Sequence, residues 1–522
     1  MKNEESSYEG LPKYPESYWL DSTERPEFPS LTGHTDTDVI IVGGGITGFT
    51  TGYLLVKEGF KVVILEADQI FNGTTGHTTA KITAQHNLIY DELIDHFDED
   101  YAKTYYESNM NAFQFMQDFI KEHNVDCDYE IKDHILYATT EKSVKKLEKE
   151  KKAYDKLGIP SELVDSVSIN VPAKKALVMK DQAQFHPLKY LLKLVEEFTA
   201  NGGVIHEKST AQNIRTEPET GGERLTVTTR EGASISGNHV ISCSHYPFYD
   251  GGSLYFSRLH AERSYIIAAK GNVEDLDSMY ISVDSPTRSV RTTKINGETY
   301  LLLAGDGHKT GQGEPMIKHY EALRAFGKEA FEITDIPYRW SAQDLYTLDK
   351  VPYIGPLSTN HWHILVATGF KKWGMTFGTV SAFILRDYVL DRDTPEMEVF
   401  KPDRFKADPS IKTFLKENLN VAKEFVKGKY DRTEKNPDDL EIDEGCVVTV
   451  NGSRAGAYRD TDGKLHVVDT TCTHLSCEVE WNNGERSWDC PCHGSRFNYD
   501  GEVMEGPAQE PLRRMDPHER LS

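Results

Sequence analysis

The sequence predicts an α/β nucleotide-binding domain near the amino end and a small all-β domain at the carboxyl end. Residues 38–66 follow the order strand, glycine turn, helix and strand. Beyond residue 437 the pattern changes to short strands separated by glycine turns, such as "CVVTV" and "TDGKLHVVD", which is typical of all-β domains. A length of 522 residues, at roughly 150 residues per domain, allows about three domains. We therefore expect a multidomain protein.

The composition narrows the class of protein. A hydrophobic fraction of 38% is enough for buried cores. The net charge of −24 disfavours generic binding to nucleic acid or to anionic membranes, although a local basic patch could still bind a partner. We find no run of about 18 apolar residues and no apolar core of a signal peptide near the amino end, so we expect a cytoplasmic protein without a membrane span.

The first chemical motif is the glycine turn at residues 43–48. The short apolar strand "DVIIV" precedes it, a helical segment follows it, and the next strand, "KVVILE", ends at Glu66. Glycines at positions 43, 45 and 48 would let the backbone approach a pyrophosphate at the helix amino terminus, while the acid would bind ribose hydroxyls. An ordinary glycine turn is the alternative, but the full strand–turn–helix setting favours dinucleotide binding through Gly43, Gly45, Gly48 and Glu66.

A helical linker separates the two regions. We place it at residues 396–437, where "SIKTFLKENLNVAKEFVKGKY" is followed by the charged "DRTEKNPDDLEIDEG". The helix carries an apolar stripe on one face. Its members are Ile411, Phe414, Leu415, Leu419, Ala422, Phe425 and Val426.

The second motif is "CTHLSC" followed, after an interval, by "CPCHGS". Seven cysteines in the whole chain do not make a disulfide framework, and four of them lie in this short segment. Two cysteines and two histidines could hold tetrahedral zinc, or a [2Fe–2S] cluster with two thiolates on one iron and two imidazoles on the other. Each half supplies one Cys and one His on a short loop and also contains an extra Cys, which favours the cluster.

Residues 438–522 resemble the Rieske family, because "CTHLSC…CPCHGS" is highly specific and "GPA" at 506–508 matches the third loop. The resemblance implies one [2Fe–2S] cluster with the ligands Cys472, His474, Cys490 and His493. It also implies a disulfide between the extra cysteines, Cys477 and Cys492. High-potential relatives donate hydrogen bonds to the cluster from a serine and a tyrosine. Ser495 keeps the first donor but Phe497 replaces the second, so we expect a lower potential.

Residues 36–395 resemble the D-amino-acid-oxidase-like flavoproteins, which include glycine and sarcosine oxidases. Besides the glycine turn, the resemblance rests on the small-residue loop "GTTGHTTAKIT" (73–83) and on "ATGF" and "WGMT" near residue 370. It implies FAD, with binding residues that add to the glycine turn: Thr75, Ala211, Gly369, Gly374, Met375 and Thr376. Covalent relatives attach the flavin to a cysteine near residues 340–346. No cysteine occurs there, so we expect non-covalent FAD.

The flavoprotein resemblance also implies two interleaved domains after an amino-terminal extension, residues 1–35. The expected fold is an α/β, Rossmann-like FAD domain interleaved with an α+β substrate domain, whose antiparallel sheet roofs the flavin, followed by the small all-β Rieske domain. The FAD domain would use residues 36–90, 185–255 and 345–395. The substrate domain would use residues 91–184 and 256–344.

Catalytic residues are harder to predict. Arg288 and Arg291 in "SPTRSVRTT" could clamp a substrate carboxylate, although a solvated charged strand is the simpler explanation. His308 and Lys372 could reach the flavin, but single residues of these types are more often structural.

The two cofactors together suggest a relay. A flavin carries two electrons and a Rieske cluster one. We expect a soluble oxidoreductase that oxidises a C–N bond of an amine or amino acid and releases electrons through the cluster to an unknown acceptor. The alternative is an electron-transfer protein without a small-molecule substrate. A Rieske oxygenase would need mononuclear iron held by two His and a carboxylate, and the sequence contains no convincing set.

Overall fold

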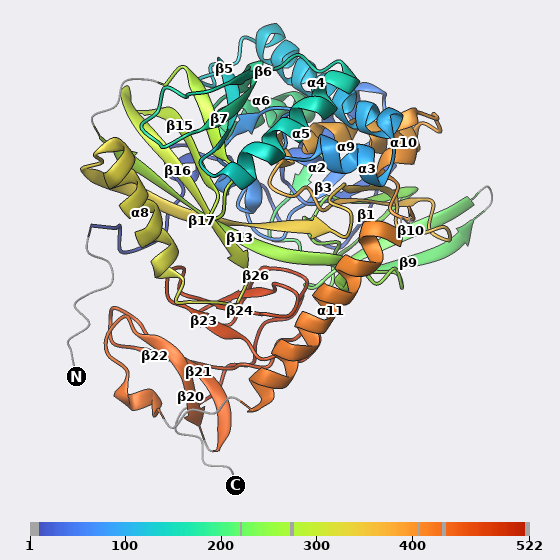
Figure 1. The fold of residues 1–522 in the computed structure, drawn as a ribbon. Coiled ribbons are helices and arrows are strands. Elements are labelled where there is room, and N and C mark those ends of the chain that lie inside the picture. The colour runs from blue at the N-terminus through green and yellow to red at the C-terminus, as the bar shows by residue number, and fades with distance from the viewer. Residues whose placement is uncertain are drawn as a thin grey trace.

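The computed structural model describes residues 10–219, 222–271, 276–404, 407–430, 435–450 and 452–516. Figure 1 shows a large α/β body, a smaller β body beneath it, and the long helix α11 running beside both. Within the described residues, no helix is both long enough and apolar enough to cross a membrane.

A six-stranded sheet with the order β18-β19-β12-β2-β3-β8 organises the first part of the large body. Its strands pair in parallel except β18, which runs antiparallel to β19. Most of these residues are buried, as continuous apolar runs in a parallel sheet should be. The strands are β2 (Val39–Val42), β3 (Val62–Leu65), β8 (Val204–His206), β12 (His239–Ser242), β18 (Tyr353–Pro356) and β19 (Ile364–Thr368).

Glycines let the helices of this part pack closely. A Cβ atom at Gly378 would lie 2.8 Å from Ile46 Cγ2, and one at Gly52 would lie 2.9 Å from the Phe198 ring. The first contact joins α9 to α2 and the second joins α2 to α6. The helices whose residues share one buried core in the large body are α2 (Ile46–Lys57), α3 (Tyr90–His96), α4 (Glu99–Glu122), α5 (Glu141–Leu157), α6 (Pro187–Ala200), α9 (Gly374–Val389) and α10 (Pro395–Phe400).

A nine-stranded sheet forms the second part of the large body. Its order is β17-β13-β16-β15-β14-β5-β7-β4, with β6 paired to β7. The expected antiparallel sheet is present, with one parallel pair between β14 and β5. Its strands are β4 (Lys81–Ile82), β5 (Glu130–Ala138), β6 (Glu162–Val164), β7 (Lys175–Gln184), β13 (Leu259–Lys270), β14 (Ser278–Ser282), β15 (Arg288–Ile295), β16 (Glu298–Lys309) and β17 (Asp335–Thr347).

Helix α8 (Ile317–Phe331) covers one face of this sheet, and the opposite face turns toward the six-stranded part. The alternation of side chains across each strand assigns residues to the two faces. Val290 packs in the core with α8, whereas Leu302 and Trp340 pack in the core shared with the six-stranded part. The amino-terminal segment joins that shared core through α1 (Tyr18–Asp21), where Trp19 is fully buried.

The remaining strands form three small sheets. One, next to the six-stranded sheet, contains β1 (His34–Asp36), β9 (Ala211–Glu219), β10 (Gly222–Thr229) and β11 (Ser234–Gly237). The other two build the carboxy-terminal body and confirm its all-β class. They contain β20 (Gly445–Val450), β21 (Ser453–Arg459) and β22 (Leu465–Asp469), and β23 (Glu480–Asn482), β24 (Ser487–Asp489), β25 (Arg496–Asn498) and β26 (Val503–Glu505).

Helix α11 (Ala407–Tyr430), in the predicted linker, has non-helical backbone at Asp408 and then runs alongside both bodies (Figure 1). The chain also forms short helical turns at α7 (Tyr255–Arg258), η1 (Thr74–His77) and η2 (Pro437–Asp439).

Candidate functional site

The glycine turn joins β2 to α2 in a conformation that requires glycine. Gly43 has φ +115°, and a Cβ atom there would lie 2.4 Å from the carbonyl oxygen of Cys243. A Cβ atom at Gly48 would lie 2.0 Å from the carbonyl oxygen of Gly43. Gly45 precedes α2 without a side-chain cap of its own, so the amides of the first turn after Ile46 can bind a phosphate.

The other predicted nucleotide residues gather around this turn. Glu66 Oε2 accepts a hydrogen bond of 2.8 Å from the Gly44 amide, and burial raises the pKa of this carboxyl. The Ser209 amide donates to the Glu66 carbonyl at 2.9 Å, and Ala211, two residues later, packs in the same buried core as Leu65 of β3. Thr75 Oγ1 accepts from the Ile46 amide at 3.2 Å, so the small-residue loop lies over the start of α2.

A second glycine turn follows β19. Gly369 has φ +79°, and a Cβ atom there would lie 2.4 Å from Thr347 Cγ2. Helix α9 begins at Gly374, again without a side-chain cap, and Met375 and Thr376 are buried in its first turn. Because α9 packs on α2 through Gly378 and Ile46, both turns belong to one region. These uncapped helix starts and glycine backbones fit a dinucleotide such as FAD.

A cluster of buried cations lies on the face of the nine-stranded sheet opposite α8. Lys81 Nζ donates to Ser289 Oγ, and Arg291 Nη2 lies 3.4 Å from the Phe185 carbonyl oxygen. Desolvation, followed by the charge of Arg291, lowers the pKa of Lys81 to about 7. Desolvation also lowers the pKa of Arg291 to about 9. In the described part of the chain neither cation forms an ion pair, and Arg291 Nε has no hydrogen-bond partner.

Two histidines extend this cluster toward α9. His134 is fully buried, and neither of its ring nitrogens has a hydrogen-bond partner within the described residues. Its ring lies 6.3 Å from that of Trp373, which in turn stacks on His86 at 4.7 Å. Thr376 Oγ1 is 3.3 Å from His86 Nε2. Unpaired buried cations and orphaned polar atoms are costly, so this cluster suits an anionic, hydrogen-bonding ligand.

Arg288 and Arg291 do not behave as either sequence explanation expected: the strand is not solvated, since Arg288 is 12% and Arg291 2% exposed, and the two side chains do not form a joint clamp. Arg288 and Arg291 are three residues apart in β15, so their side chains leave opposite faces of the sheet. Arg288 pairs with Asp306 at 2.9 Å and lies over the Phe326 ring of α8. The two arginines cannot hold one carboxylate together, and only Arg291 faces the buried cluster.

Two other catalytic candidates also lie apart from it. His308 is stacked on His319 at 4.3 Å, and its Nε2 lies 2.9 Å from the Tyr265 hydroxyl on the α8 side. Lys372 is exposed and lies near the backbone of Gly307. The structure therefore does not bring His308 or Lys372 together with Arg291.

The cysteine and histidine motif forms two loops that meet in the carboxy-terminal body. A disulfide joins Cys477 to Cys492, as the Rieske resemblance implies, and its Cα atoms are 6.5 Å apart. Cys472 and Cys490 are buried free thiols in contact with each other. The Cys490 sulfur also lies within 4.8 Å of the disulfide sulfurs, but these are not thiolates and are unsuited to bind a metal.

The donors around the two thiols fit a cluster. The hydrogen bond from Cys490 is the largest cause that lowers the pKa of Cys472, to about 7, against desolvation. The amides of His474 and Leu475 and the hydroxyl of Ser495 act in the same direction. The Cys490 sulfur accepts from the amides of His493 and Cys492.

The two histidines meet the needs of metal ligands. Their rings lie 5.1 Å apart, and desolvation lowers the pKa of His493 to about 4, so the imidazole is neutral at pH 7. Desolvation also lowers the pKa of His474. The Nδ1 atom of His474 is buried and has no hydrogen-bond partner in the described chain, as expected of a ligand atom that faces iron. The four side chains fit a [2Fe–2S] cluster.

Gln343 of β17 contacts both the small-residue loop at residues 73–83 and the loop of the cluster motif that carries Gly494, here called the cluster loop. Thr74 Oγ1 donates to the Gln343 carbonyl at 3.2 Å, and Gln343 Nε2 donates to the Gly494 carbonyl at 2.9 Å. Thr310 Oγ1 holds Gln343 Oε1 at 2.7 Å. A Cβ atom at Gly494 would lie 2.4 Å from Ala261 Cβ, so glycine permits the close approach of this loop to β13.

Buried ion pairs hold the two bodies together. Arg263 of β13 lies 3.4 Å from Glu505 and 3.7 Å from Glu485, with a side chain only 2% exposed. Within the carboxy-terminal body, Arg496 fixes these carboxylates through a bond of 2.6 Å to Glu505 and one of 3.0 Å to Asp489. Because such charges are stable only when paired, these contacts support a fixed docking of the carboxy-terminal body.

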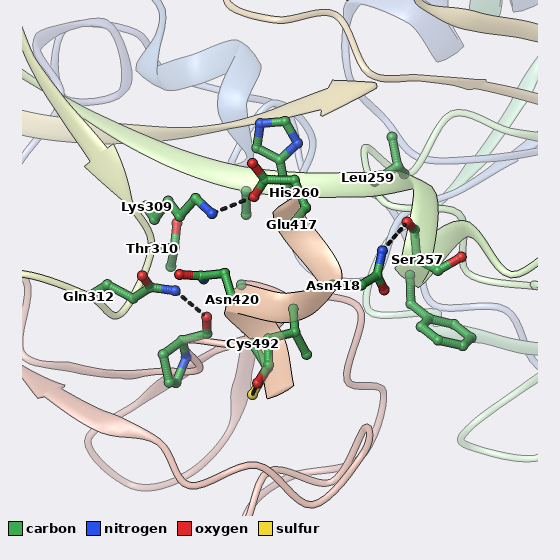
Figure 2. A pocket seen from close by; sticks show the side chains of 15 residues that line it. Ser257, Leu259, His260, Lys309, Thr310, Gln312, Glu417, Asn418, Asn420 and Cys492 are labelled. Atoms are coloured by element: carbon green, nitrogen blue, oxygen red, sulfur yellow. Dashed lines mark hydrogen bonds and ion pairs between the residues drawn. The ribbon is translucent and has the colours of Figure 1, made fainter. Parts of the chain in front are cut away.

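A small cavity of about 20 Å³, enough for about one water molecule, lies at the same junction. Figure 2 shows it between α11, β13 and the loop that carries Cys492. Gln312 Nε2 donates to the Pro491 carbonyl at 2.8 Å, and Lys309 pairs with Glu417 of α11.

Comparison with known families agrees with this geometry. Residues 38–388 match the family described as FAD dependent oxidoreductase, and residues 434–516 match the Rieske [2Fe-2S] domain. The chain is an FAD-dependent oxidoreductase with a carboxy-terminal Rieske domain. Its cofactors are FAD and a [2Fe–2S] cluster, and its fold class is the predicted one.

One relative of this oxidoreductase matches nearly the whole chain, and two others match about 70% of it. A Bacillus subtilis (strain 168) protein named as a Rieske 2Fe-2S iron-sulfur protein, YhfW, is 50% identical over 96% of this chain and 98% of its own length. The gamma-glutamylputrescine oxidoreductase of Escherichia coli (strain K12) is 23% identical over 70% of this chain and 87% of its own length. The glycine oxidase structure from Geobacillus kaustophilus has a TM-score of 0.60 at 17% identity, covering 71% and 99% of the two chains.

Sequence reasoning missed several residues of the buried cation cluster and of the junction. Lys81 stands within the loop quoted for FAD, but a single lysine carries no signal of burial. His134 and Gln343 lie in strands without a motif, and only tertiary packing brings Trp373 beside the first and the loops of Thr74 and Gly494 beside the second.

Proposed function

We propose that this protein oxidises the C–N bond of a carboxylate-bearing amine, such as an amino acid, and passes the electrons through its Rieske cluster to an acceptor outside the chain. FAD, when bound, supplies two-electron chemistry, and the cluster transfers electrons singly. Oxidation of an amine to an imine releases two electrons and two protons, so two successive one-electron transfers complete each turnover.

The observation that carries the relay is the contact through Gln343. Its main chain holds the loop of Thr74, which we propose contacts FAD, and its side chain holds Gly494 of the cluster loop. The buried pairs of Arg263 with Glu485 and Glu505 support a permanent contact. Such a junction favours transfer inside the chain over transfer between separate proteins.

For the cofactor residues, we propose the sets that the two resemblances imply. Cys472, His474, Cys490 and His493 would hold the cluster, which the orphaned Nδ1 of His474 supports. FAD would lie along the two glycine turns, and its proposed contacts are Gly43, Gly45, Gly48, Glu66, Thr75, Ala211, Gly369, Gly374, Met375 and Thr376.

The buried cations support the carboxylate. Lys81 and Arg291 are closely placed, desolvated and without an ion pair in the described chain, so a substrate carboxylate would offset an electrostatic cost. Orphaned His134 nitrogens beside Trp373 add hydrogen-bonding capacity in the same place. We therefore propose that Lys81 and Arg291 orient the substrate, and that the buried side chains around them exclude water.

The test is anaerobic mixing of the purified protein with a panel of amino acids and of the corresponding decarboxylated amines. We expect an amino acid to bleach the flavin absorbance and then to produce the electron paramagnetic resonance signal of a reduced Rieske cluster. A Cys472→Ser variant should keep flavin bleaching but lose the cluster signal. Bleaching without cluster reduction in the wild type would reject the relay. Bleaching only by the amines would reject the carboxylate, and no bleaching by any compound would favour an electron-transfer protein.

A further inference from the structure

Helix α11 turns most of its large apolar residues away from the protein. The stripe predicted from the sequence does lie on one face, but that face is exposed, with Leu415 55% and Leu419 69% exposed. The other exposed large apolar residues of the helix are Ile411, Phe414, Phe425 and Val426. An amphipathic helix of a globular protein normally buries its apolar face, so this exposure marks an interaction site.

Polar residues of α11 face the protein instead. Figure 2 shows Glu417, Asn418 and Asn420 directed at the junction of the two bodies. Glu417 pairs with Lys309, and Asn418 Nδ2 donates to the Ser257 carbonyl at 3.1 Å. These contacts fix the orientation of the helix about its own axis, because a rotation that turned the apolar stripe toward the protein would break them.

A row of lysines borders the stripe on the same outward surface. Lys416 and Lys427 have side chains 76% and 63% exposed, and Lys412 and Lys423 are also exposed. With 3.6 residues per turn these four positions fall on one side of the stripe. After the kink at Asp408, the acidic residues of α11 are Glu417 and Glu424, whose side chains are only 10% and 12% exposed.

We propose that α11 lies on the surface of a bilayer that contains anionic lipids, with its apolar stripe among the acyl chains and its lysine row at the headgroups. A helix with one apolar face and lysines beside it has the features of such interfacial helices. Charge argues against a second copy as the occupant. An antiparallel pair of α11 helices would bring lysines against lysines. A parallel pair would leave each lysine row without an acidic partner, because the carboxylates of both helices are turned inward.

The net charge of −24 does not prevent this binding, because charges beyond about 8 Å are largely screened at physiological salt. The helix adjoins the cluster loop, where the Val421 carbonyl oxygen lies 4.0 Å from Cys492 Sγ. Leu475, next to His474, is itself exposed. The bilayer would thus lie near the cluster, although the binding itself does not depend on the proposed electron relay.

The test is flotation of the full-length protein, with its cofactors bound, with phosphatidylcholine vesicles made with and without phosphatidylglycerol. We expect the wild type to float only with the anionic vesicles. A Leu415→Glu/Leu419→Glu variant should lower the bound fraction roughly tenfold or more, since both changes place charge in the apolar stripe. Flavin and cluster absorbance would verify that each variant is intact.

A matched pair of lysine variants separates the surface of α11 from general electrostatics. In both, four exposed lysines become Gln, so the charge changes equally. The first variant changes Lys412, Lys416, Lys423 and Lys427 of α11. The control changes Lys142, Lys145, Lys146 and Lys149 of α5, a helix without exposed large apolar residues.

We expect only the α11 variant to lose vesicle binding. Absence of wild-type binding, or an equal loss in the α5 control, would overturn the proposal. Sedimentation of the wild type and the variant tests the oligomeric state. If the wild type is a dimer and Leu415→Glu/Leu419→Glu dissociates it, this face is an interface between two copies, and the membrane proposal is overturned.

Discussion

Ser495 should set part of the reduction potential of the cluster. Its side chain is fully buried, and its hydroxyl donates a hydrogen bond to the Cys472 sulfur. The hydroxyl oxygen accepts a hydrogen bond of 3.0 Å from the Ala508 amide. Changing Ser495→Ala removes the hydroxyl donor to the sulfur. The reduced cluster is the more negative state and gains more from such a donor, so the potential should fall.

The size of the shift follows from one hydrogen bond. A hydrogen bond to a charged group contributes about 1.5–3 kcal/mol, and only the part that differs between the two redox states counts. If roughly half of it differs, the change is about 1 kcal/mol. Since about 1.4 kcal/mol corresponds to about 59 mV for one electron, the expected shift is about −40 mV.

The assay is a redox titration of the full-length protein that follows the cluster spectrum. Thr473→Ala is the matched control, because Thr473 lies between two proposed ligands but its hydroxyl donates to the Glu510 carbonyl at 2.6 Å. Phe497→Tyr should raise the potential if its new hydroxyl reaches a sulfur. An unchanged potential in Ser495→Ala, or an equal shift in Thr473→Ala, would refute the reasoning.

Three further predictions concern the substrate site, the junction and the flavin. Lys81→Met should raise the KM for a carboxylate-bearing substrate roughly tenfold. In the wild type, KM should rise as pH rises through about 7, where Lys81 loses its proton. Measured over the same pH range, the KM of the variant should not show this rise. Arg263→Leu should lower the free energy of unfolding, measured in denaturant, by about 1.5–3 kcal/mol, because Glu485 and Glu505 lose one cation but keep Arg496 as a partner. In the wild type, the low pKa of Glu505, near 2, means that its stabilising contribution is lost as pH falls from about 4.5 to about 2. Acid precipitation should release the flavin into solution, and flavin left in the pellet would show a covalent bond.

The sequence alone determined the cofactor chemistry, because that chemistry resides in short contiguous loops. The glycine turn at Gly43 needs positive φ and bare backbone, and such demands appear directly as residue types. The cluster motif likewise places its Cys and His on two short loops with fixed spacing. The fold class followed from the same local patterns and from the families that carry them.

Tertiary structure alone decided what those loops face. Lys81, His134 and Arg291 come from β4, β5 and β15. In the order of the sheet β7, β5 and β14 lie between β4 and β15, so the three residues meet only because the sheet brings strands that are not neighbours into contact, as the bonds of Lys81 to Ser289 and of Gln184 to Thr292 show. The opposite directions of Arg288 and Arg291 follow from the pleat of β15, but that Arg291 meets the buried cluster and Arg288 meets α8 depends on how the sheet packs.

The stripe on α11 has the same periodicity whether it points inward or outward. Its direction depends on distant partners, since Glu417 meets Lys309 and Asn418 meets Ser257. Periodicity records which residues share a face, whereas the side that is buried depends on the free energy of every contact the opposite face can make.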